Sequence, residues 1–390
     1  MSRRRAKKKV LFITGTRADF GKLKPLMLEV ERAPEFECHI FATGMHTLSR
    51  YGFTYDEIRK SGFKRIFLYM NQVPAGGAEM DLVLAHTIEG LGRYVREYRP
   101  RLLVVHGDRV EALAGAIVGS LNNILVAHVE GGEISGTVDE LIRHAVSKLS
   151  HIHFVANQEA RRRLIQLGER QENVFITGSP EIDVMLSDNL PTLEQAKRRY
   201  RIRFDDYALF IYHPVTTEYQ STLARARQVV EALKESGLNF VVIQPNNDLG
   251  GDMVRELVEK LRGHPRFRVF PSLRFEHFLT LVKNCRLVVG NSSVVVREAP
   301  VYGVPSINLG TRQMGRFHHR TIVTVPEEKP AILAALADPP PRGEPSLHFG
   351  KGDSARRFMQ ALRRPSLWQT PPQKQFRDLE PGPPPGGPDA

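Results

Sequence analysis

An α/β fold of two Rossmann-like, doubly wound domains is predicted by two observations. Short apolar runs alternate with helical patterns along most of the 390 residues, and the same alternation starts again near residue 207. Apolar runs without polar alternation are typical of strands buried in parallel sheets. A helix between successive strands favours a parallel sheet with helices on both faces. Two such halves would face one another across a cleft.

The N-terminal half begins with the run VLFIT at 10–14, which leads through the loop GTRADFG into a helix. Helices are predicted where apolar residues recur at helical spacing, as Leu141, Ile142, Ala145, Val146 and Leu149 do. The expected strands are 10–14, 37–42, 66–69, 102–106, 124–127, 152–156 and 174–177. The expected helices are 23–32, 55–60, 80–98, 110–120 and one that carries Leu141 to Leu149.

The C-terminal half repeats this architecture without a detectable sequence repeat. Residues 187–205 are polar and basic, which indicates a connection plus a helix. The expected strands are 207–212, 240–244, 268–270, 287–290 and 306–309. The expected helices are 223–236, 253–261 and 275–283, and a further helix is expected to start at Asn291-Ser292-Ser293.

These elements divide the chain into five parts. Residues 1–9 form a basic flank, 10–186 an N-terminal Rossmann-like domain and 187–337 a C-terminal Rossmann-like domain. Residues 338–364 are expected to form a connection and a C-terminal helix. The tail at 365–390 is rich in proline and glycine, and we expect it to be disordered because it can bury little apolar surface.

Composition limits the classes of partner. No run of 18 apolar residues is present, and the basic N-terminus leads into a short strand without the apolar h-region of a signal peptide, so we expect a cytoplasmic protein without a membrane partner. The formal charge is +12, but six positive residues precede the first strand and no aromatic residues are interleaved with them. An anionic small substrate accounts for the remaining charge as well as nucleic acid does. Cys38 and Cys285 have no ligand spacing and suit packing.

The glycine-rich acidic loop after the strand at 124–127 is the first candidate for a site. Gly131, Gly132 and Gly136 would let backbone approach a ligand closely. Glu130, Glu133 and Asp139 place carboxylates where strand ends of α/β sheets commonly form sites. Thr137 and Glu140 fit a capping box. The alternative is that these acidic residues merely favour a helix N-terminus or are solvated.

Two further strand ends carry polar residues. GTRADFGKL is neither a dinucleotide fingerprint nor a Walker A loop, yet Arg17 at a helix N-terminus can bind phosphate or a sugar hydroxyl. A surface salt bridge is the alternative for Arg17. Asp108 and Arg109 follow the strand LLVVH, and Asp108 is either a site residue or an N-cap.

In the second half, Ser292 and Ser293 open a predicted helix whose amides and hydroxyls could hold a diphosphate. Glu298 could accept hydrogen bonds from ribose hydroxyls. An ordinary serine N-cap followed by a helix-face glutamate is the alternative. His144, His151 and His153 lack a zinc spacing, so we expect packing roles for them and no metal site.

The motifs together resemble the hydrolysing UDP-N-acetylglucosamine 2-epimerases of sialic acid biosynthesis. The matching blocks are GTRADFGKLKPL, HGDR, HVEGGEISGTVDELIRHAVSKLSHIHFV, HPVTT, GNSS with a following RE, and INLGTRQ. The resemblance implies a GT-B-like fold, a UDP-sugar substrate, no cofactor and a homo-oligomer. It implies conversion of UDP-GlcNAc and water to N-acetylmannosamine and UDP, by anti elimination to 2-acetamidoglucal and hydration with inversion at C2.

The resemblance also implies roles for individual residues. Asp108, Glu130, Asp139 and His213 are similar to the family's catalytic acid and base residues. Like charges in one cluster are expected to push the pKa values of the carboxylates apart. The residues similar to the family's sugar-nucleotide ligands are Arg17 and Arg109 at the site, Ser292 and Ser293 at the diphosphate, Glu298 at the ribose, and Arg312.

The chain departs from the family pattern after the two serines, where a glycine is usual. Val294, Val295 and Val296 follow instead, and a β-branched residue beside phosphate could shift the diphosphate. Other activities stay open. A hydrolysing 2-epimerase of UDP-2,4-diacetamido-bacillosamine, for legionaminic acid synthesis, shares these motifs. A non-hydrolysing epimerase is less favoured because GTRAD and HVEGGEISGT resemble the hydrolysing branch. A retaining glycosyltransferase of the same fold class would need an acceptor. A non-catalytic sugar-nucleotide sensor would not need four titratable groups in one cleft.

Overall fold

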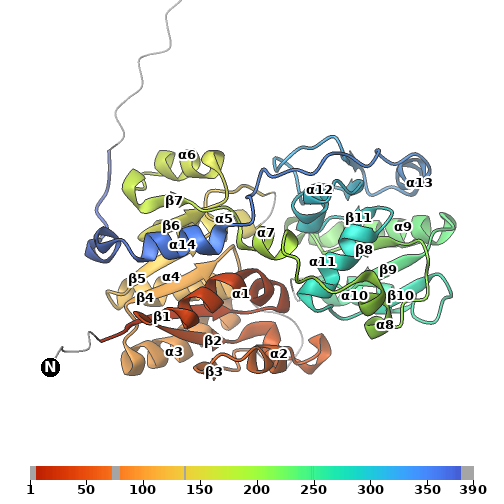
Figure 1. The fold of residues 1–390 in the computed structure, drawn as a ribbon. Helices are drawn as coiled ribbons and strands as arrows, with labels where there is room; N and C mark the ends of the chain where they lie inside the picture. The colour runs from red at the N-terminus through yellow and green to blue at the C-terminus, as the bar shows by residue number, and fades with distance from the viewer. Residues whose placement is uncertain (1–5, 73–79, 136–137, 247, 249, 379–390) are drawn as a thin grey trace, which may run out of the picture.

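Two parallel β-sheets lie side by side in the computed structural model, each with helices on both faces (Figure 1). The structure describes residues 6–72, 80–135, 138–246, 248 and 250–378. The strand order is β3-β2-β1-β4-β5-β6-β7 in the first sheet and β10-β9-β8-β11-β12-β13 in the second. The order therefore reverses direction between β1 and β4 and again between β8 and β11. The predicted fold of two doubly wound α/β halves is confirmed.

The first sheet is built from the N-terminal half of the chain. Its strands are β1 Lys8–Thr14, β2 Phe36–Ala42, β3 Ile66–Leu68, β4 Leu102–His106, β5 Leu125–Val129, β6 Ile152–Val155 and β7 Val174–Ile176. Its helices are α1 Arg17–Arg32, α2 Tyr55–Lys60, α3 Met80–Tyr98, α4 Val110–Leu121, α5 Val138–Leu149, α6 Gln158–Gln166 and α7 Pro180–Met185. Two 3-10 turns, η1 Gly44–Thr47 and η2 Ser49–Tyr51, follow β2, and η3 Gln171–Asn173 precedes β7.

The second sheet is built from the C-terminal half. Its strands are β8 Ala208–Ile211, β9 Phe240–Ile243, β10 Phe267–Phe270, β11 Val288–Gly290, β12 Ser306–Leu309 and β13 Ile322–Val325. The helices around it are α8 Leu193–Tyr200, α9 Thr222–Glu235, α10 Gly251–Glu259, α11 Phe275–Asn284, α12 Glu298–Val301 and α13 Lys329–Ala337. The 3-10 turns η4 Thr216–Ser221 and η5 Ser293–Val295 follow β8 and β11.

Several elements differ from the expected ones. Helix α1 starts six residues earlier, because the Thr16 side chain caps it by accepting a hydrogen bond from the backbone N–H of Asp19 at 3.1 Å. Only η5 and the four-residue α12 stand where a longer helix was expected after Asn291. Leu141, expected on the apolar face of α5, is 72% exposed. The helices α6, α7 and α13 and the strand β13 were not expected.

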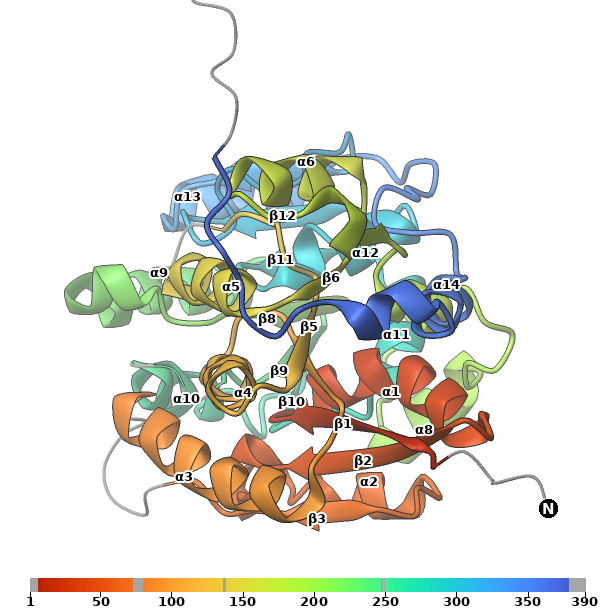
Figure 2. The ribbon, with the colours of Figure 1, turned by 90° about the vertical axis from the view of Figure 1, so that its left-hand side faces the viewer.

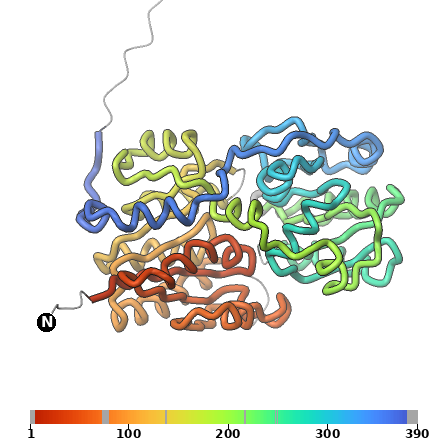
Figure 3. The backbone as a smooth tube through the Cα atoms, viewed as in Figure 1, coloured from red at the N-terminus to blue at the C-terminus, as the bar shows by residue number. Residues whose placement is uncertain are grey.

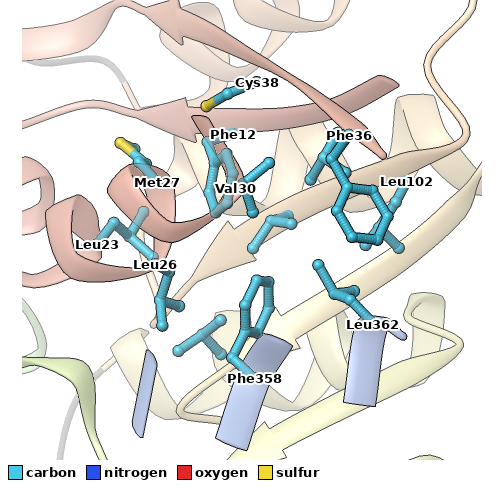
Figure 4. Close-up of a cluster of buried hydrophobic side chains, with 14 of the residues drawn as sticks. Phe12, Leu23, Leu26, Met27, Val30, Phe36, Cys38, Leu102, Phe358 and Leu362 are labelled. Carbon is cyan, nitrogen blue, oxygen red and sulfur yellow. The ribbon is translucent and has the colours of Figure 1, made fainter. Parts of the chain in front are cut away.

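The chain crosses between the halves twice, as the tube in Figure 3 shows. After α7 it passes to α8 in the second half, and after α13 it returns so that α14, Ser354–Leu362, packs beside α1 (Figure 2). Phe358 and Leu362 of α14 join Phe12, Leu26 and Phe36 in one buried cluster (Figure 4). The C-terminal helix therefore completes the core of the N-terminal half.

The expectation of disorder from residue 365 onward is corrected for residues 365–378. Pro365–Gln369 forms the 3-10 turn η6, in which the Trp368 indole N–H donates to the carbonyl of Leu362 at 2.7 Å and its ring stacks on Phe36. Further on, Lys374 Nζ lies 2.6 Å from Glu169 Oε2. The contacts of Trp368 and Lys374 hold this segment against the N-terminal half despite its proline-rich composition. Residues 379–390 lie outside the described residues, and the five-part division of the chain stays a prediction.

None of the helices in the described ranges combines the length and the hydropathy that crossing a lipid bilayer requires.

We predict that Trp368→Ala lowers the free energy of unfolding by about 3 kcal/mol, because a large, mostly buried aromatic side chain is removed from the cluster of α1 and α14. Urea unfolding followed by circular dichroism measures the loss, since Trp368 is the only tryptophan and its fluorescence disappears with it. Phe376→Ala is the control, because Phe376 is 90% exposed. Equal unfolding midpoints for the two variants would contradict the role of η6.

Candidate active site

One cavity of about 340 Å³ lies between the two halves, at the carboxyl ends of both sheets. Its lining includes loops that follow β1 and β4 in the first sheet and β8 and β11 in the second. These are the two places where the strand order reverses, which is where open α/β sheets bind ligands. All ten predicted site residues line it: Arg17, Asp108, Arg109, Glu130, Asp139, His213, Ser292, Ser293, Glu298 and Arg312.

The side chain at the centre of the site is Arg297, to which the sequence analysis assigned no role. It enters from the loop between η5 and α12 of the C-terminal half and is 2% exposed. Its guanidinium donates to Glu130 at 2.9 Å, to Ser179 at 2.7 Å and to Glu181 at 2.7 Å, and it also pairs with Glu133. All four acceptors belong to the N-terminal half, so Arg297 joins the two halves.

Glu130 is held in an uncommon backbone conformation directly after β5. Its φ is +65°, in the left-handed region, where a non-glycine residue is strained by roughly 1 kcal/mol or more. The carboxylate sits between Arg297 and His106, whose Nε2 is 3.2 Å from Glu130 Oε2. Burial raises the pKa of Glu130, but Arg297 and His106 outweigh it and hold the pKa well below its usual range. Glu130 is therefore ionised in the cavity.

His106, at the end of β4, is a buried cation. Its Nδ1 donates to Asp19 at 2.8 Å, and Asp19 accepts a second hydrogen bond from the backbone N–H of Gly15. Burial lowers the pKa of His106, while Glu130 and Asp19 on either side raise it to a net value of about 10. Its position directly before Gly107-Asp108-Arg109 at a strand end is a sequence signal that could have identified it.

Two further carboxylates are each paired with an arginine. Asp108 forms an ion pair with Arg143 of α5, and despite burial this lowers the pKa of Asp108 to about 2. Asp108 does not cap α4, because Arg109 occupies the N-cap position. Asp139, also on α5, lies 3.2 Å from Arg312 of the C-terminal half. Arg143 stands four residues after Asp139 on the same helix face, a spacing that could have identified it but was not used.

The expectation that repulsion separates the pKa values of clustered carboxylates is wrong for Glu130, Glu133 and Asp108. The pKa of each is lowered, because Asp108 pairs with Arg143 while Glu130 and Glu133 both pair with Arg297. Guanidinium groups placed between the carboxylates replace repulsion with attraction. The site therefore holds several ionised carboxylates at once.

His213, directly after β8, is in the opposite charge state to His106. Burial lowers its pKa well below the usual range, and Arg312 and Arg109 lower it further. Its Nδ1 accepts a hydrogen bond from the backbone N–H of Asn246 at 3.2 Å, so the proton of the neutral ring is on Nε2. Asn291 fixes the backbone of His213 by two hydrogen bonds at 2.7 and 2.8 Å. His213 is therefore a neutral N–H donor.

The arginines expected at the ligand already have partners. Arg17 donates to Ser272 of the C-terminal half at 2.7 Å and pairs with Glu57 at 2.8 Å. Arg109 Nε lies 3.3 Å from Glu111. Both line the cavity, so a ligand would meet cations whose orientation is already set by protein contacts. The salt bridge proposed as the alternative for Arg17 is thus present, but at the cavity wall.

Ser292 and Ser293 line the cavity from η5, and Glu298 Oε1 is 3.3 Å from Lys22 Nζ of α1. Lys22 was noted only as part of a failed Walker A match, so its contact across the halves was missed. The three valines that follow the serines are buried, and all three pack in one hydrophobic cluster of the second half. Their bulk is thus accommodated mainly by the core of that half.

The glycines of the acidic loop serve packing within the protein. A Cβ at Gly132 would lie 2.3 Å from the carbonyl oxygen of Ala160, and a Cβ at Gly131 would lie 2.8 Å from His128 Nδ1. Neither residue lines the cavity, so the expected close approach to a ligand is corrected. Gly136 and Thr137, and hence the proposed capping box, lie outside the described residues. Glu140 accepts a hydrogen bond from the backbone N–H of Ser135.

The three histidines considered as metal ligands have protein partners instead. His153 Nε2 is 2.9 Å from Glu169, His144 Nε2 is 3.2 Å from Glu140, and His151 accepts from the backbone N–H of Val126. Within the described part of the chain, no three His, Cys, Asp or Glu side chains are grouped as metal ligands.

Comparison with known proteins places the chain in a family. The family profile described as UDP-N-acetylglucosamine 2-epimerase matches residues 28–363. The chain is 45% identical to UDP-N-acetylglucosamine 2-epimerase of Neisseria meningitidis serogroup B, covering 95% of this chain and 99% of that protein. It is 33% identical to UDP-N,N'-diacetylbacillosamine 2-epimerase (hydrolyzing) of Legionella pneumophila, covering 91% and 96%.

The fold is also similar to a solved structure. A crystal structure of UDP-GlcNAc 2-epimerase from Neisseria meningitidis bound to UDP-GlcNAc matches with a TM-score of 0.75 at 17% identity, over 91% of this chain and 99% of that one. On the family profile and the sequence identities, this chain belongs to the UDP-N-acetylglucosamine 2-epimerase family.

Proposed function

We propose that the protein converts UDP-GlcNAc and water to N-acetylmannosamine and UDP, as a hydrolysing 2-epimerase of sialic acid biosynthesis. The observation that carries this proposal is that the two halves line the cavity with different chemical groups. The N-terminal half supplies the ionised carboxylates Glu130 and Asp108, and the C-terminal half supplies N–H and O–H donors and Arg312. A reaction that moves a proton on the sugar while a diphosphate leaves requires both sets.

The first step is elimination of UDP across C1 and C2. A carboxylate takes the C2 proton, the C–H electrons form the C1=C2 double bond, and the C1–O bond breaks as UDP leaves. The second step is hydration, in which water adds its hydroxyl to C1 and a proton returns to C2 on the opposite face. The product is free N-acetylmannosamine. One proton is removed from C2 in the elimination and one proton is added to C2 in the hydration.

Donors on the C-terminal half suit the leaving diphosphate. His213 presents a neutral Nε2–H, Ser292 and Ser293 present hydroxyls and Arg312 supplies positive charge, while Arg109 adds a second positive charge from the N-terminal half. Donors fixed before the reaction stabilise developing negative charge without a cost in reorganisation. The resemblance of the GNSS motif and the position of Glu298 in the cavity support ribose binding at that end.

Carboxylates on the N-terminal half suit proton transfer at C2. In the ligand-free site each has an arginine partner, which lowers its basicity. The diphosphate competes for the same cations, and Arg312 stands between Asp139 and the loop of Ser292 because it also donates to the carbonyl of Asn291 at 3.3 Å. If the bound nucleotide draws Arg312 away from Asp139, Asp139 becomes a stronger base than it is in the ligand-free site.

A second substrate is favoured by one specific observation. The 33% identical Legionella pneumophila relative bears the name of a hydrolysing UDP-N,N'-diacetylbacillosamine 2-epimerase. That sugar has an acetamido group at C4 and lacks the C6 hydroxyl, while its reacting atoms C1 and C2 are the same. The same elimination and hydration then apply to the diacetamido-bacillosamine nucleotide.

The experiment that tests the function is proton NMR of the protein incubated with UDP-GlcNAc in D2O. We expect free N-acetylmannosamine with deuterium at C2, together with UDP, because the C2 proton is exchanged with solvent during elimination and hydration. Formation of UDP-N-acetylmannosamine would instead identify a non-hydrolysing epimerase. No turnover by folded protein would direct the test to the diacetamido-bacillosamine nucleotide.

Asp139→Asn should lower turnover by about 100-fold or more, the usual scale for an acid–base group. The Kd for UDP should not increase. The amide keeps the volume of the side chain but cannot take a proton. Steady-state kinetics and calorimetric UDP titration measure the two effects. Leu141→Ala is a control on the same helix, since Leu141 is 72% exposed and does not line the cavity. Unchanged turnover in Asp139→Asn would remove Asp139 from the mechanism.

We also predict that EDTA leaves turnover intact, because Arg109, Arg312 and the His213 N–H supply the charge and the hydrogen bond that the leaving diphosphate needs. Initial rates with and without the chelator, on enzyme dialysed against EDTA, measure this. Loss of activity that added Mg²⁺ or Zn²⁺ restores would show that the site uses a metal ion.

A further inference from the structure

A buried carboxylate behind the cavity is not explained by substrate binding. Glu181 lies on α7, just before the chain crosses to the C-terminal half, and it is 0% exposed. It is absent from the cavity lining, to which Arg297, Lys22, Glu130 and Glu298 belong. An ionisable group this deeply buried is costly unless it is paired, so its partners indicate its role.

Those partners are two cations from opposite halves. Glu181 Oε1 accepts from Arg297 Nε at 2.9 Å and from Arg297 Nη2 at 2.7 Å. The same oxygen is 3.4 Å from Lys22 Nζ, whose side chain comes from α1. Glu181 Oε2 has no hydrogen-bond partner among the described residues. Glu181 thus holds both cations through a single oxygen atom.

Both cations continue into the cavity. Arg297 reaches Glu130 at 2.9 Å and also pairs with Glu133, and Lys22 reaches Glu298 at 3.3 Å. The guanidinium and the ammonium repel each other, and the carboxylate between them removes this repulsion. A displacement of Arg297 would move Glu130, and a displacement of Lys22 would move Glu298, and both carboxylates line the cavity.

We propose that Glu181 is a positioning residue for the epimerase reaction: it fixes Arg297 and Lys22 behind the cavity, so that Glu130 is aligned for proton transfer at C2. The proposal rests on the function proposed above. Glu181 acts through Arg297, which Glu181 orients by accepting two hydrogen bonds from the guanidinium. Its effect therefore falls on the chemical step, whereas the diphosphate meets donors that Glu181 does not touch.

Glu181→Gln is the informative variant, because it keeps the side-chain volume and one acceptor oxygen but removes the charge. We expect kcat to fall by about 10- to 100-fold, the scale of a small displacement of reacting groups, with KM and UDP affinity little changed. Glu181→Asp keeps the charge and should recover part of the lost kcat. Glu276→Gln is the matched control: Glu276 pairs with Lys24 of the same helix α1 at 2.8 Å but does not line the cavity.

A double-mutant cycle with Arg297→Lys tests whether Glu181 affects kcat through Arg297. If Glu181 acts through Arg297, adding Glu181→Gln to Arg297→Lys lowers kcat no further than the stronger single variant does. Wild-type kcat in Glu181→Gln, or losses that multiply in the double variant, would overturn the proposal. A rise in KM with kcat unchanged would overturn it as well, because it would assign Glu181 to binding.

A structural readout separates this inference from the proposed function. The crystal structure of substrate-free Glu181→Gln should show the Arg297 guanidinium displaced from Glu130, and Glu276→Gln should leave it in place. An Arg297 guanidinium unmoved in Glu181→Gln overturns the positioning role even if no substrate is turned over. Absence of turnover by the wild type on both UDP-sugars, with Arg297 displaced in the variant, would instead overturn the proposed function. If Glu181→Gln fails to fold, Glu181→Asp is examined by the same kinetics and crystallography.

Discussion

The buried guanidinium of Arg297 is the interaction on which the arrangement of the two halves depends. A charge with 2% exposure carries a desolvation penalty of several kcal/mol, and only good hydrogen-bonding geometry offsets it. Glu130, Glu133, Glu181 and Ser179 supply that geometry from the other half of the chain. Removal of one partner with the halves closed would leave a buried charge unpaired, at a cost of about 3–5 kcal/mol in comparable buried pairs.

This constraint brings two different chemical surfaces together. Carboxylates follow β4 and β5 in one sheet, and N–H and O–H donors follow β8 and β11 in the other. Each half also adds a group of the other kind, since Arg109 of the first half and Glu298 of the second line the same cavity. The histidines show the same principle at single residues. His106 is charged because carboxylates lie on both of its sides, and His213 is neutral because burial disfavours its charged form and two arginines lower its pKa further. Identical side chains therefore have different chemistry in one cavity.

The C-terminal segment contributes stability far from the cavity. Helix α14 and the turn η6 return to the N-terminal half, where Phe358 and Trp368 pack against β1, β2 and α1. The chain thus connects the halves at two points, after α7 and before α14 (Figure 1). Two connections limit how the halves can move relative to one another, and Glu181 lies close to the first of them.

By itself, the sequence determined the order of strands and helices and the loops that carry chemistry, because apolar runs and strand-end residues such as Asp108, Glu130 and Ser292 are local signals. His106 and Arg143 were missed, although their position and spacing were local signals that could have identified them. Only the tertiary structure decided the partners of Arg297, Lys22 and Glu181, since their contacts join residues more than 100 positions apart. Only the tertiary structure decided the charge states of the ionisable side chains in the cavity, because a pKa depends on neighbours that no local pattern specifies.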